Sequence, residues 1–256
     1  MLNIKTINYR IKFLEAISFK EEPEIAFFKT IFNRLKGILC INRKEECISC
    51  GHNYKCLYSY LTAVDFKYIE NLPIIVKRPL FSKKTMKAEN ILDLKFTFLG
   101  DSIKHMDFID FIIKEFEARG LYRESYKFVI INRNTDQSQI VEKAGKIIGI
   151  RILTPIDVKE DIFVKEKNKL DSLNKIYNIT DDPIDEINIT YQFDGIKFKV
   201  NNPLRIGAGK IIQEGYVGMV KFDEPIGDSN LLNIINIIGA GRFYAIGGGA
   251  IEVCRI

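Results

Sequence analysis

Four of the five cysteines in this chain of 256 residues lie within 17 residues, and this cluster restricts what the chain can fold into more than any other feature. The cluster consists of Cys40, Cys47, Cys50 and Cys56, spaced C-x6-C-x2-C-x5-C. Thiolates two residues apart can bind one ion from a tight turn, and two more from nearby positions would complete a tetrahedral shell of four sulfurs. We therefore expect residues 40–56 to form a metal-binding segment that holds structural zinc, with an iron–sulfur cluster as the alternative.

The residues between these cysteines are mostly polar turn formers that cannot pack a core by themselves, so a metal would organise the loop. Two other interpretations stay open. The four cysteines could be free thiols without a metal, or His52 could replace one of them as a ligand. Because there is one C-x2-C pair where a zinc ribbon has two, the pattern leaves the identity of the metal open.

Composition places the chain among globular proteins. Hydrophobic residues make up 46% of it, and 38 Lys and Arg against 33 Asp and Glu leave a net charge of +5, which argues against a disordered chain or a strongly basic tail. The first residues lack the order of a secretory signal, and no apolar run approaches the roughly 20 residues of a membrane-spanning helix. We expect a cytoplasmic protein without a membrane partner.

The first half of the chain reads as one α+β unit that ends near residue 133. A strand-like start is followed by a helix that begins at Pro23 and ends near Gly37, directly before the cysteines. Alternating residues 94–98 predict a strand, and Gly100 then leads into a second helix that stops at Gly120. A further strand is expected over residues 127–131.

The second half repeats this alternation after a polar segment at residues 132–145. We expect a strand over residues 147–153, a helix over 162–177, a strand over 216–222, a helix capped at Asp228 or Ser229, and a last strand over 251–253. Asp194-Gly195 stands between two alternating segments and predicts a two-residue hairpin turn, since both of its residues tolerate positive φ. Two tandem α+β units, each with a helix-covered antiparallel sheet, are the fold that this pattern predicts.

Basic residues gather in the second unit. Residues 197–221 carry a net charge of +4 of the +5 of the whole chain, from Lys197, Lys199, Arg205, Lys210 and Lys221 against Glu214. Basic residues in a glycine-rich region suit contact with a phosphate backbone, although a solvated lysine face is as common.

The second half of the chain contains two glycine-rich segments, one within the basic stretch and one near the last strand. Residues 207–210 lack the upstream glycine and the hydroxyl residue of a P-loop, so they form no nucleotide cradle. Residues 239–249 read G-x-G-x5-G-x-G, around Arg242 and Tyr244. This segment is either a loop that leads into the last strand or a backbone that approaches phosphates, with Arg242 supplying charge and Tyr244 a stacking face.

Together these motifs resemble the RAMP superfamily of CRISPR-associated RNA-binding proteins, and specifically its endoribonuclease branch with a four-cysteine insert that processes precursor crRNA. The resemblance rests on the glycine run, the cysteines followed by residues 56–61, Lys77-Arg78-Pro79-Leu80, Thr154-Pro155 and residues 215–218. It implies two ferredoxin-like domains across a basic cleft, at residues 1–135 with the insert at 40–56 and at residues 145–256 with the glycine-rich loop. It also implies repeat RNA as substrate and CRISPR effector subunits as further partners.

The resemblance implies metal-independent cleavage, in which the 2′-hydroxyl attacks the adjacent phosphate to leave a 2′,3′-cyclic phosphate and a 5′-hydroxyl, so that zinc would be structural. Many members of the branch place a histidine in or just after the first helix, but residues 23–39 contain none. Our candidates for catalysis are His52 as general base with Lys29 and Lys36 as cations. The RNA-binding candidates are Lys197, Lys199, Arg205, Lys210, Gly239, Gly241, Arg242, Tyr244, Gly247 and Gly249.

Two other functions compete with this one. One is a RAMP subunit without cleavage activity, which clamps the crRNA handle in an effector complex. This function needs no general base, so the scarcity of histidine, with two in the whole chain, mildly favours it. A metal-stabilised protein interaction module unrelated to RNA would require the resemblance to be accidental.

Overall fold

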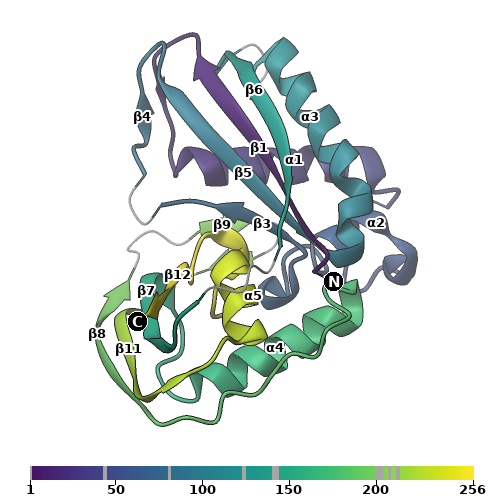
Figure 1. Ribbon diagram of the computed structural model, residues 1–256. Coiled ribbons are helices and arrows are strands. Elements are labelled where there is room, and N and C mark those ends of the chain that lie inside the picture. Colours follow the sequence, from purple (N-terminus) through teal and green to yellow (C-terminus); the bar gives the residue numbers. More distant parts are fainter. Residues whose placement is uncertain are drawn as a thin grey trace.

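The computed structural model describes residues 2–42, 45–79, 82–122, 125–139, 144–199, 204–206, 209–211 and 214–256. Its first half forms a four-stranded antiparallel sheet in the order β3-β5-β1-β6, and helices α1 and α3 lie on one face of that sheet (Figure 1). These elements are β1 (Ile4–Phe13), α1 (Pro23–Leu39), β3 (Ile74–Lys77), β5 (Ile91–Leu99), α3 (Met106–Arg119) and β6 (Phe128–Gln137). The chain order is therefore βαββαβ, which is the ferredoxin-like arrangement.

The second half repeats the same arrangement, with its sheet in the order β12-β7-β11-β8. Its elements are β7 (Ile147–Ile156), α4 (Ile162–Tyr177), β8 (Tyr191–Lys199), β11 (Glu214–Ile226), α5 (Asn230–Ile238) and β12 (Ile251–Arg255). The expected fold class of two tandem ferredoxin-like units is confirmed. The strands of the first sheet fall within residues 4–137 and those of the second within 147–255, while the exact domain limits of 1–135 and 145–256 stay a prediction.

Smaller elements complete the described chain. Two short strand pairs, β2 with β4 and β9 with β10, lie outside the main sheets. These are β2 (Ile17–Ser18), β4 (Thr85–Met86), β9 (Leu204–Ile206), β10 (Gly209–Ile211), helix α2 (Leu57–Leu61) and the 3-10 turns η1 (Asn53–Lys55), η2 (Ile69–Asn71), η3 (Gly100–His105) and η4 (Tyr244–Ile246). In the part of the chain that the structure describes, no helix has the length and apolar character required to span a bilayer.

Local sequence explains where the helices begin and end. Pro23 stands in the first turn of α1, where its missing N–H costs nothing, and the Ser229 hydroxyl caps α5 by accepting a 3.2 Å hydrogen bond from the Leu232 N–H. Helix α1 continues two residues past Gly37, so that Cys40 is its C-terminal cap. The first cysteine is thereby fixed to the end of a rigid helix.

The predicted hairpin at Asp194-Gly195 is wrong. Strand β8 runs straight through both residues and pairs along its length with β11, with Gly195 opposite Gly218. A Cβ on Gly218 would lie 2.3 Å from the Asp194 carbonyl oxygen, and one on Gly195 would lie 2.4 Å from the Val217 carbonyl oxygen. The glycines therefore serve a close approach of two strands, which a single sequence cannot distinguish from a turn.

Aromatic side chains fill the core between α1 and the first sheet. Phe28 packs against Phe32 and against Phe96 of β5, with ring centroids 4.6 and 6.4 Å apart respectively, and Phe27 packs against Phe128 of β6 at 5.3 Å. All five rings are at most 1% exposed. Two of these pairs are edge-to-face and the Phe28–Phe96 pair is stacked, and both geometries add to the energy of burial that holds α1 against the sheet.

Polar contacts join the two units. The hydroxyl of Tyr177 at the end of α4 donates a 2.8 Å hydrogen bond to the Asn71 carbonyl, and the Arg78 side chain, after β3, donates from Nε to the Ile246 carbonyl at 2.8 Å. Gly100 lies against the Tyr177 carbonyl so closely that a Cβ there would be 1.7 Å from its oxygen. The segment around β3 and η2 is thus bound to the glycine-rich loop of the second unit.

Candidate functional site

The glycine-rich loop, residues 239–249, connects α5 to β12 and faces the first unit. Gly239, Gly241, Gly247 and Gly249 all have positive φ, which explains the glycines at these positions. The aliphatic stem of Arg78 lies over Gly247, where a Cβ would be 2.1 Å from the arginine Cγ. Gly247 thus has a structural role in the packing of the two units, whereas contact of the four glycines with RNA stays a prediction.

The predicted role of Tyr244 as a stacking face for RNA is wrong. Its side chain is 1% exposed, and its hydroxyl donates a 2.6 Å hydrogen bond to the Leu72 carbonyl of the first unit. Burial, reinforced by nearby Tyr177 and Glu166, raises the pKa of Tyr244 well above its ordinary value, so the hydroxyl remains a donor. A buried ring covered by the Lys169 ammonium, 4.7 Å from the ring centroid, offers no stacking face to a nucleobase.

Two backbone N–H groups of this loop donate hydrogen bonds to carboxylates of the same unit. The Gly241 N–H donates to Glu166 Oε1 at 2.6 Å, and the Arg242 N–H donates to Asp157 Oδ1 at 2.8 Å. Glu166 is 2% exposed and pairs with Lys169 at 2.5 Å. These two N–H groups are therefore satisfied within the protein, whereas the half-exposed Arg242 guanidinium extends to 3.4 Å from Glu70 of the first unit.

The basic stretch of the second unit is spread over β8, β9, β10 and β11, and two of its lysines lie on β8. Lys197 and Lys199 are exposed, and both approach Glu214 on the neighbouring strand, at 2.5 and 3.6 Å. The hydrogen bond from Lys197 is the largest cause that lowers the pKa of Glu214, with a smaller contribution from Lys199. The backbones of Arg205 and Lys210 pair across β9 and β10, but their side chains lie outside the described residues.

The three catalytic candidates occupy separate environments. His52 is exposed and precedes η1, whereas Lys29 and Lys36 both lie on α1, two helical turns apart. Lys29 pairs with Glu21 at 2.8 Å, and Lys36 pairs with Asp65 at 2.7 Å. Although partial burial lowers the pKa of Lys36, the hydrogen bond to Asp65 and neighbouring negative charges outweigh it, and the net pKa is raised. Lys36 is therefore a permanent cation and unsuited to act as a base.

The second histidine has a different setting. His105 stands at the start of α3, with its ring centroid 6.1 Å from Tyr60 and 6.3 Å from Phe108. Burial, and then repulsion from Lys104, lowers its pKa. His105 is packed among aromatic rings, while His52 lies beside the cysteines.

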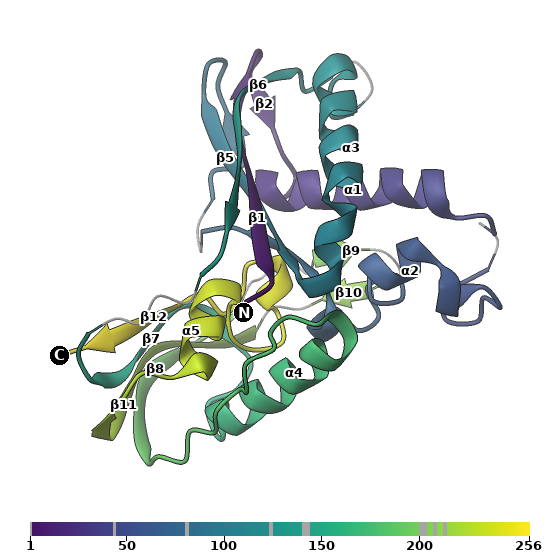
Figure 2. The ribbon, with the colours of Figure 1, turned by 45° about the vertical axis from the view of Figure 1, so that its right-hand side comes forward.

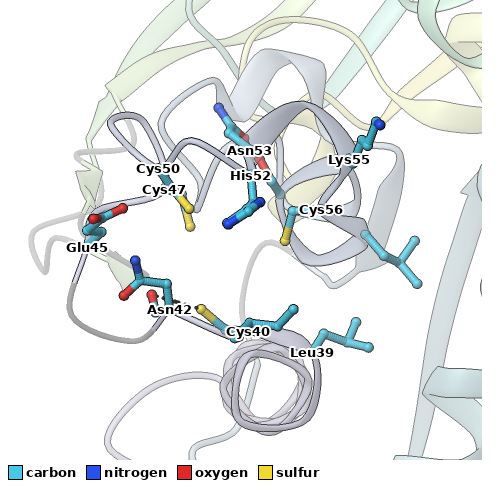
Figure 3. Close-up of a pocket in the computed structure, with 13 residues that line it drawn as sticks. Leu39, Cys40, Asn42, Glu45, Cys47, Cys50, His52, Asn53, Lys55 and Cys56 are labelled. Atoms are coloured by element: carbon cyan, nitrogen blue, oxygen red, sulfur yellow. Dashed lines mark hydrogen bonds between the residues drawn. The ribbon is translucent and has the colours of Figure 1, made fainter.

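All four clustered cysteines line one pocket at the end of α1, together with His52, Glu45 and Asn42 (Figure 3). Cys40 comes from the helix end, Cys47 and Cys50 from the following turns, and Cys56 from the start of α2; all four are free thiols. Within the described ranges, no three His, Cys, Asp or Glu side chains lie close enough together to hold a metal ion. The four thiols are of the donor type that a four-thiolate shell needs, but they are not assembled into one here, so the expected metal site stays a prediction.

Several residues of this region were not identified from the sequence. The sequence singles out Lys77 and Arg78 only as part of a motif, and it gives no indication of a role for Asp65, Glu166 or Lys169. A buried charge has no distinct signal in one sequence, because its partner comes from a distant segment, as Glu166 does for Gly241 75 residues away. Proximity in the fold alone reveals such pairs.

A family model described as AF_1859_N, N-terminal domain, matches residues 2–151. The chain belongs to this family. The region that matches the AF_1859_N family contains the whole first sheet, the cysteine segment and the segment of Arg78. No curated protein matches the chain.

Solved structures extend the likeness of this AF_1859_N member to its full length. A Cas6 product complex (TTHB231) matches with a TM-score of 0.54 and 11% identity, over 98% of this chain and 100% of that one. A Cas6-related protein from Pyrococcus furiosus matches with a TM-score of 0.52 and 10% identity, over 98% and 99%. A chain in a partial Cas6-RT-Cas1–Cas2 complex matches with a TM-score of 0.55 and 11% identity, over 100% of this chain and 46% of that one. At this level of identity the matches establish the fold, which is the Cas6 tandem ferredoxin-like fold.

Proposed function

We propose that the chain binds CRISPR repeat RNA and cleaves precursor crRNA without a catalytic metal. The 2′-hydroxyl of one nucleotide attacks the adjacent phosphate, and the bond to the 5′-oxygen of the next nucleotide breaks, leaving a 2′,3′-cyclic phosphate and a 5′-hydroxyl. The observation that carries this proposal is the complete pair of ferredoxin-like units, which corresponds to the whole length of two Cas6 or Cas6-related proteins. A fold hosts more than one activity, so the proposal also depends on the basic residues and on the experiment below.

RNA contact is assigned to exposed basic residues. Lys197 and Lys199 project from β8, the edge strand of its sheet, and Arg242 stands at the junction of the two units. Each lies near a carboxylate that a phosphate group would replace as its partner. Replacing Lys197 and Lys199 by Ala should weaken RNA binding. It should also lower the slope of log affinity against log salt concentration by the amount that corresponds to about two phosphate contacts. Lys175→Ala, on the exposed side of α4, is the matched control for loss of a positive charge.

Catalysis is assigned first to His52 as the base that accepts the 2′-hydroxyl proton, because it is exposed and follows the first helix. Lys29 would supply positive charge near the five-coordinate phosphorus of the transition state. For this the Lys29 ammonium would have to leave Glu21 and pair with the phosphate of the RNA. His105 is less suited, since Tyr60 and Phe108 pack against its ring.

A second function is favoured by one observation. Both lysine candidates are held in ion pairs with carboxylates, so the described residues show no assembled group of base and free cation. This arrangement suits a RAMP subunit that binds the crRNA handle within an effector complex and does not cut it.

The test is incubation of the purified protein with the repeat RNA of its host in excess EDTA, with circular dichroism to verify the fold. We expect one cleavage position, and we expect His52→Ala to reduce the rate by a factor of about 100 or more while binding persists. His105→Ala is the matched control and should retain most of the rate. Tight binding of RNA without cleavage would favour the subunit function, and absence of binding would contradict both functions.

A further inference from the structure

The segment at residues 68–72 of the first unit is bound to the second unit at its end. The Tyr177 hydroxyl donates to the Asn71 carbonyl at 2.8 Å, and the Tyr244 hydroxyl donates to the Leu72 carbonyl at 2.6 Å. Turn η2, which contains Asn71, also packs against α4 and against η4 of the glycine-rich loop. The backbone of this segment is therefore fixed where the two units meet.

The chain enters this segment through a left-handed turn at residues 63–66. The φ values of Ala63, Val64, Asp65 and Phe66 are 44°, 63°, 54° and 66°, although none of these residues is a glycine. Contacts with α1 hold the turn, because Asp65 pairs with Lys36 at 2.7 Å and the Phe66 ring lies 5.4 Å from the ring of Phe32. Backbone strain persists where surrounding contacts determine the conformation, and here it fixes how the chain approaches Tyr68.

Tyr68 presents an aromatic ring at the surface of this junction. The residue is 41% exposed, and the ammonium of Lys67 is 5.9 Å from its ring centroid. The Tyr68 N–H donates to the Ala63 carbonyl at 3.3 Å, and the Tyr68 carbonyl accepts from the Asn71 N–H at 2.8 Å. An exposed ring beside a cation, on a backbone that is already fixed, suits stacking with a nucleobase, because every base has a π-face.

Arg242 reaches the same segment from the second unit. Its Nε is 3.4 Å from Oε2 of Glu70, which stands two residues after Tyr68, and its side chain is 54% exposed. The Arg242 backbone is held as well, since its N–H donates to Asp157 Oδ1 at 2.8 Å. The junction thus brings a half-exposed guanidinium of one unit to within two residues of an exposed ring of the other.

The contact with Glu70 leaves the Arg242 guanidinium able to bind an anion. Glu70 Oε2 accepts no hydrogen bond from the described residues, so the contact at 3.4 Å is a loose ion pair between partly exposed side chains. Ion pairs of this kind contribute little in water. The guanidinium also carries several N–H donors in a planar fork, which matches the geometry of a phosphate. Lys67 adds a second cation on the same segment, so the local charge favours an anionic ligand.

We propose that Tyr68 and Arg242 form a subsite for one unpaired nucleotide, in which the Tyr68 ring stacks on the base and the Arg242 guanidinium binds an adjacent phosphate. The nucleotide must be unpaired, because a base inside a duplex has no free face for an aromatic side chain. The inference rests on the proposed binding of repeat RNA, and it assigns to Tyr68 the stacking role that the buried Tyr244 does not fill.

The experiment compares RNA affinities by fluorescence anisotropy, with repeat RNA that carries a 2′-deoxynucleotide at the cleaved position so that cleavage does not interfere. Circular dichroism verifies the fold of each variant. Tyr68→Ala should weaken binding about 5- to 100-fold, whereas Tyr68→Trp, which keeps a stacking surface, should stay within about threefold of the wild type.

Tyr122→Ala is the matched control for loss of an exposed tyrosine. Tyr122 is 43% exposed, and it lies beyond the end of α3 that is remote from the second unit, since the other end follows Gly100, which lies against Tyr177. The RNA affinity of Tyr122→Ala should stay close to that of the wild type.

The dependence of affinity on salt separates the two contacts of the subsite. Arg242→Ala should lower the slope of log affinity against log salt concentration by about one phosphate contact. Tyr68→Ala should leave this slope unchanged, because stacking on a neutral ring releases no counterions. With a fully paired duplex of the same sequence, wild type and Tyr68→Ala should bind equally.

A second measurement covers the case in which Tyr68→Ala does not fold. The chain contains no tryptophan, so Tyr68→Trp introduces a single fluorophore, whose emission should be quenched when RNA stacks on it. Emission from Tyr122→Trp should change little.

The inference would be overturned by equal RNA affinity of folded Tyr68→Ala and wild type, by equal losses in Tyr68→Ala and Tyr122→Ala, or by unquenched Tyr68→Trp in the RNA complex. In each of these cases the wild type still binds RNA, so the proposed function survives. A wild type that binds no RNA would overturn the proposed function and this subsite together.

Discussion

Single residues at the junction of the two units have roles that their positions in the sequence conceal. Tyr244 stands among glycines and beside Arg242, as a stacking residue of an RNA-binding loop would, yet its ring is buried and its hydroxyl binds a carbonyl of the other unit. A tyrosine that stacks on RNA and a tyrosine that is buried between the units give the same sequence pattern, because the pattern reports the residue type and not the direction of the side chain. What decides between them is the position of Leu72, 172 residues earlier.

This assignment predicts the effect of Tyr244→Phe. Loss of the hydroxyl leaves the buried Leu72 carbonyl without this donor, so the free energy of unfolding should fall by about 1–3 kcal/mol, measured by denaturant titration. RNA affinity of the folded protein should stay close to that of the wild type. Tyr126→Phe, which removes an exposed hydrogen bond of 2.7 Å to the Ser18 carbonyl, should cost less. An RNA-specific loss without loss of stability would restore the stacking role.

Lys77 predicts a pH dependence of stability. Burial, and then repulsion from Lys95 directly opposite on β5, lowers the pKa of Lys77 from 10.5 to about 8. Between these two values the unfolded chain keeps the proton that the folded protein loses, so the contribution of Lys77 to the free energy of unfolding rises with pH. Below about pH 8 both states are protonated, and the cost of burying the charge is fully present.

Relative to Lys77→Met, the wild type should therefore gain roughly 2 kcal/mol between pH 7.5 and pH 9.5 in urea unfolding. The comparison with the variant removes the contributions of the other groups that titrate in this range. Parallel pH profiles for the two proteins would contradict the lowered pKa.

At the scale of the elements, the sequence predicts the helices well and the strand pairing in part. The starts at Pro23 and Ser229 and the stop at Gly120 depend on interactions within a few residues, so they are visible in the chain. The Asp194-Gly195 pair depends on Gly218 across the sheet, and its local pattern suggested a turn that does not exist. For the candidate site, the sequence brought the cysteines and His52 together, but the Asp65 turn that supports Lys36 has no local signal.

The glycine-rich loop provides a test at this scale. Gly249 has a φ of +66°, and a Cβ there would lie 1.6 Å from the Ala240 carbonyl oxygen. Gly249→Ala should therefore destabilise the protein by more than about 1 kcal/mol in thermal or urea unfolding. Gly227 has no atom within 4 Å of the position of a Cβ, so Gly227→Ala should stay within about 0.5 kcal/mol of the wild type. Equal effects of the two changes would show that the loop is not held as described.

In the whole molecule, the two ferredoxin-like units are connected by side chains that donate to carbonyls of the opposite unit. Tyr177, Tyr244 and Arg78 each make one such bond, and the views in Figures 1 and 2 show α4, α5 and the loop after α5 packed against the lower end of the first sheet. Figure 2 also places α2 and the end of α1 on the side away from β8, β11 and β12. The cysteine pocket and the lysines of β8 are consequently separate features of the molecule.

The proposed cleavage of repeat RNA by its own 2′-hydroxyl is tested most directly with a substrate that lacks this group. Two repeat RNAs, one unmodified and one with a single 2′-deoxynucleotide at the cleaved position, are incubated with the wild-type protein in EDTA. We predict that both bind with equal affinity, that the unmodified RNA yields a 2′,3′-cyclic phosphate end, and that the substituted RNA remains intact at that position. Cleavage of the substituted RNA at the same position, or cleavage that requires a divalent ion, would contradict the account.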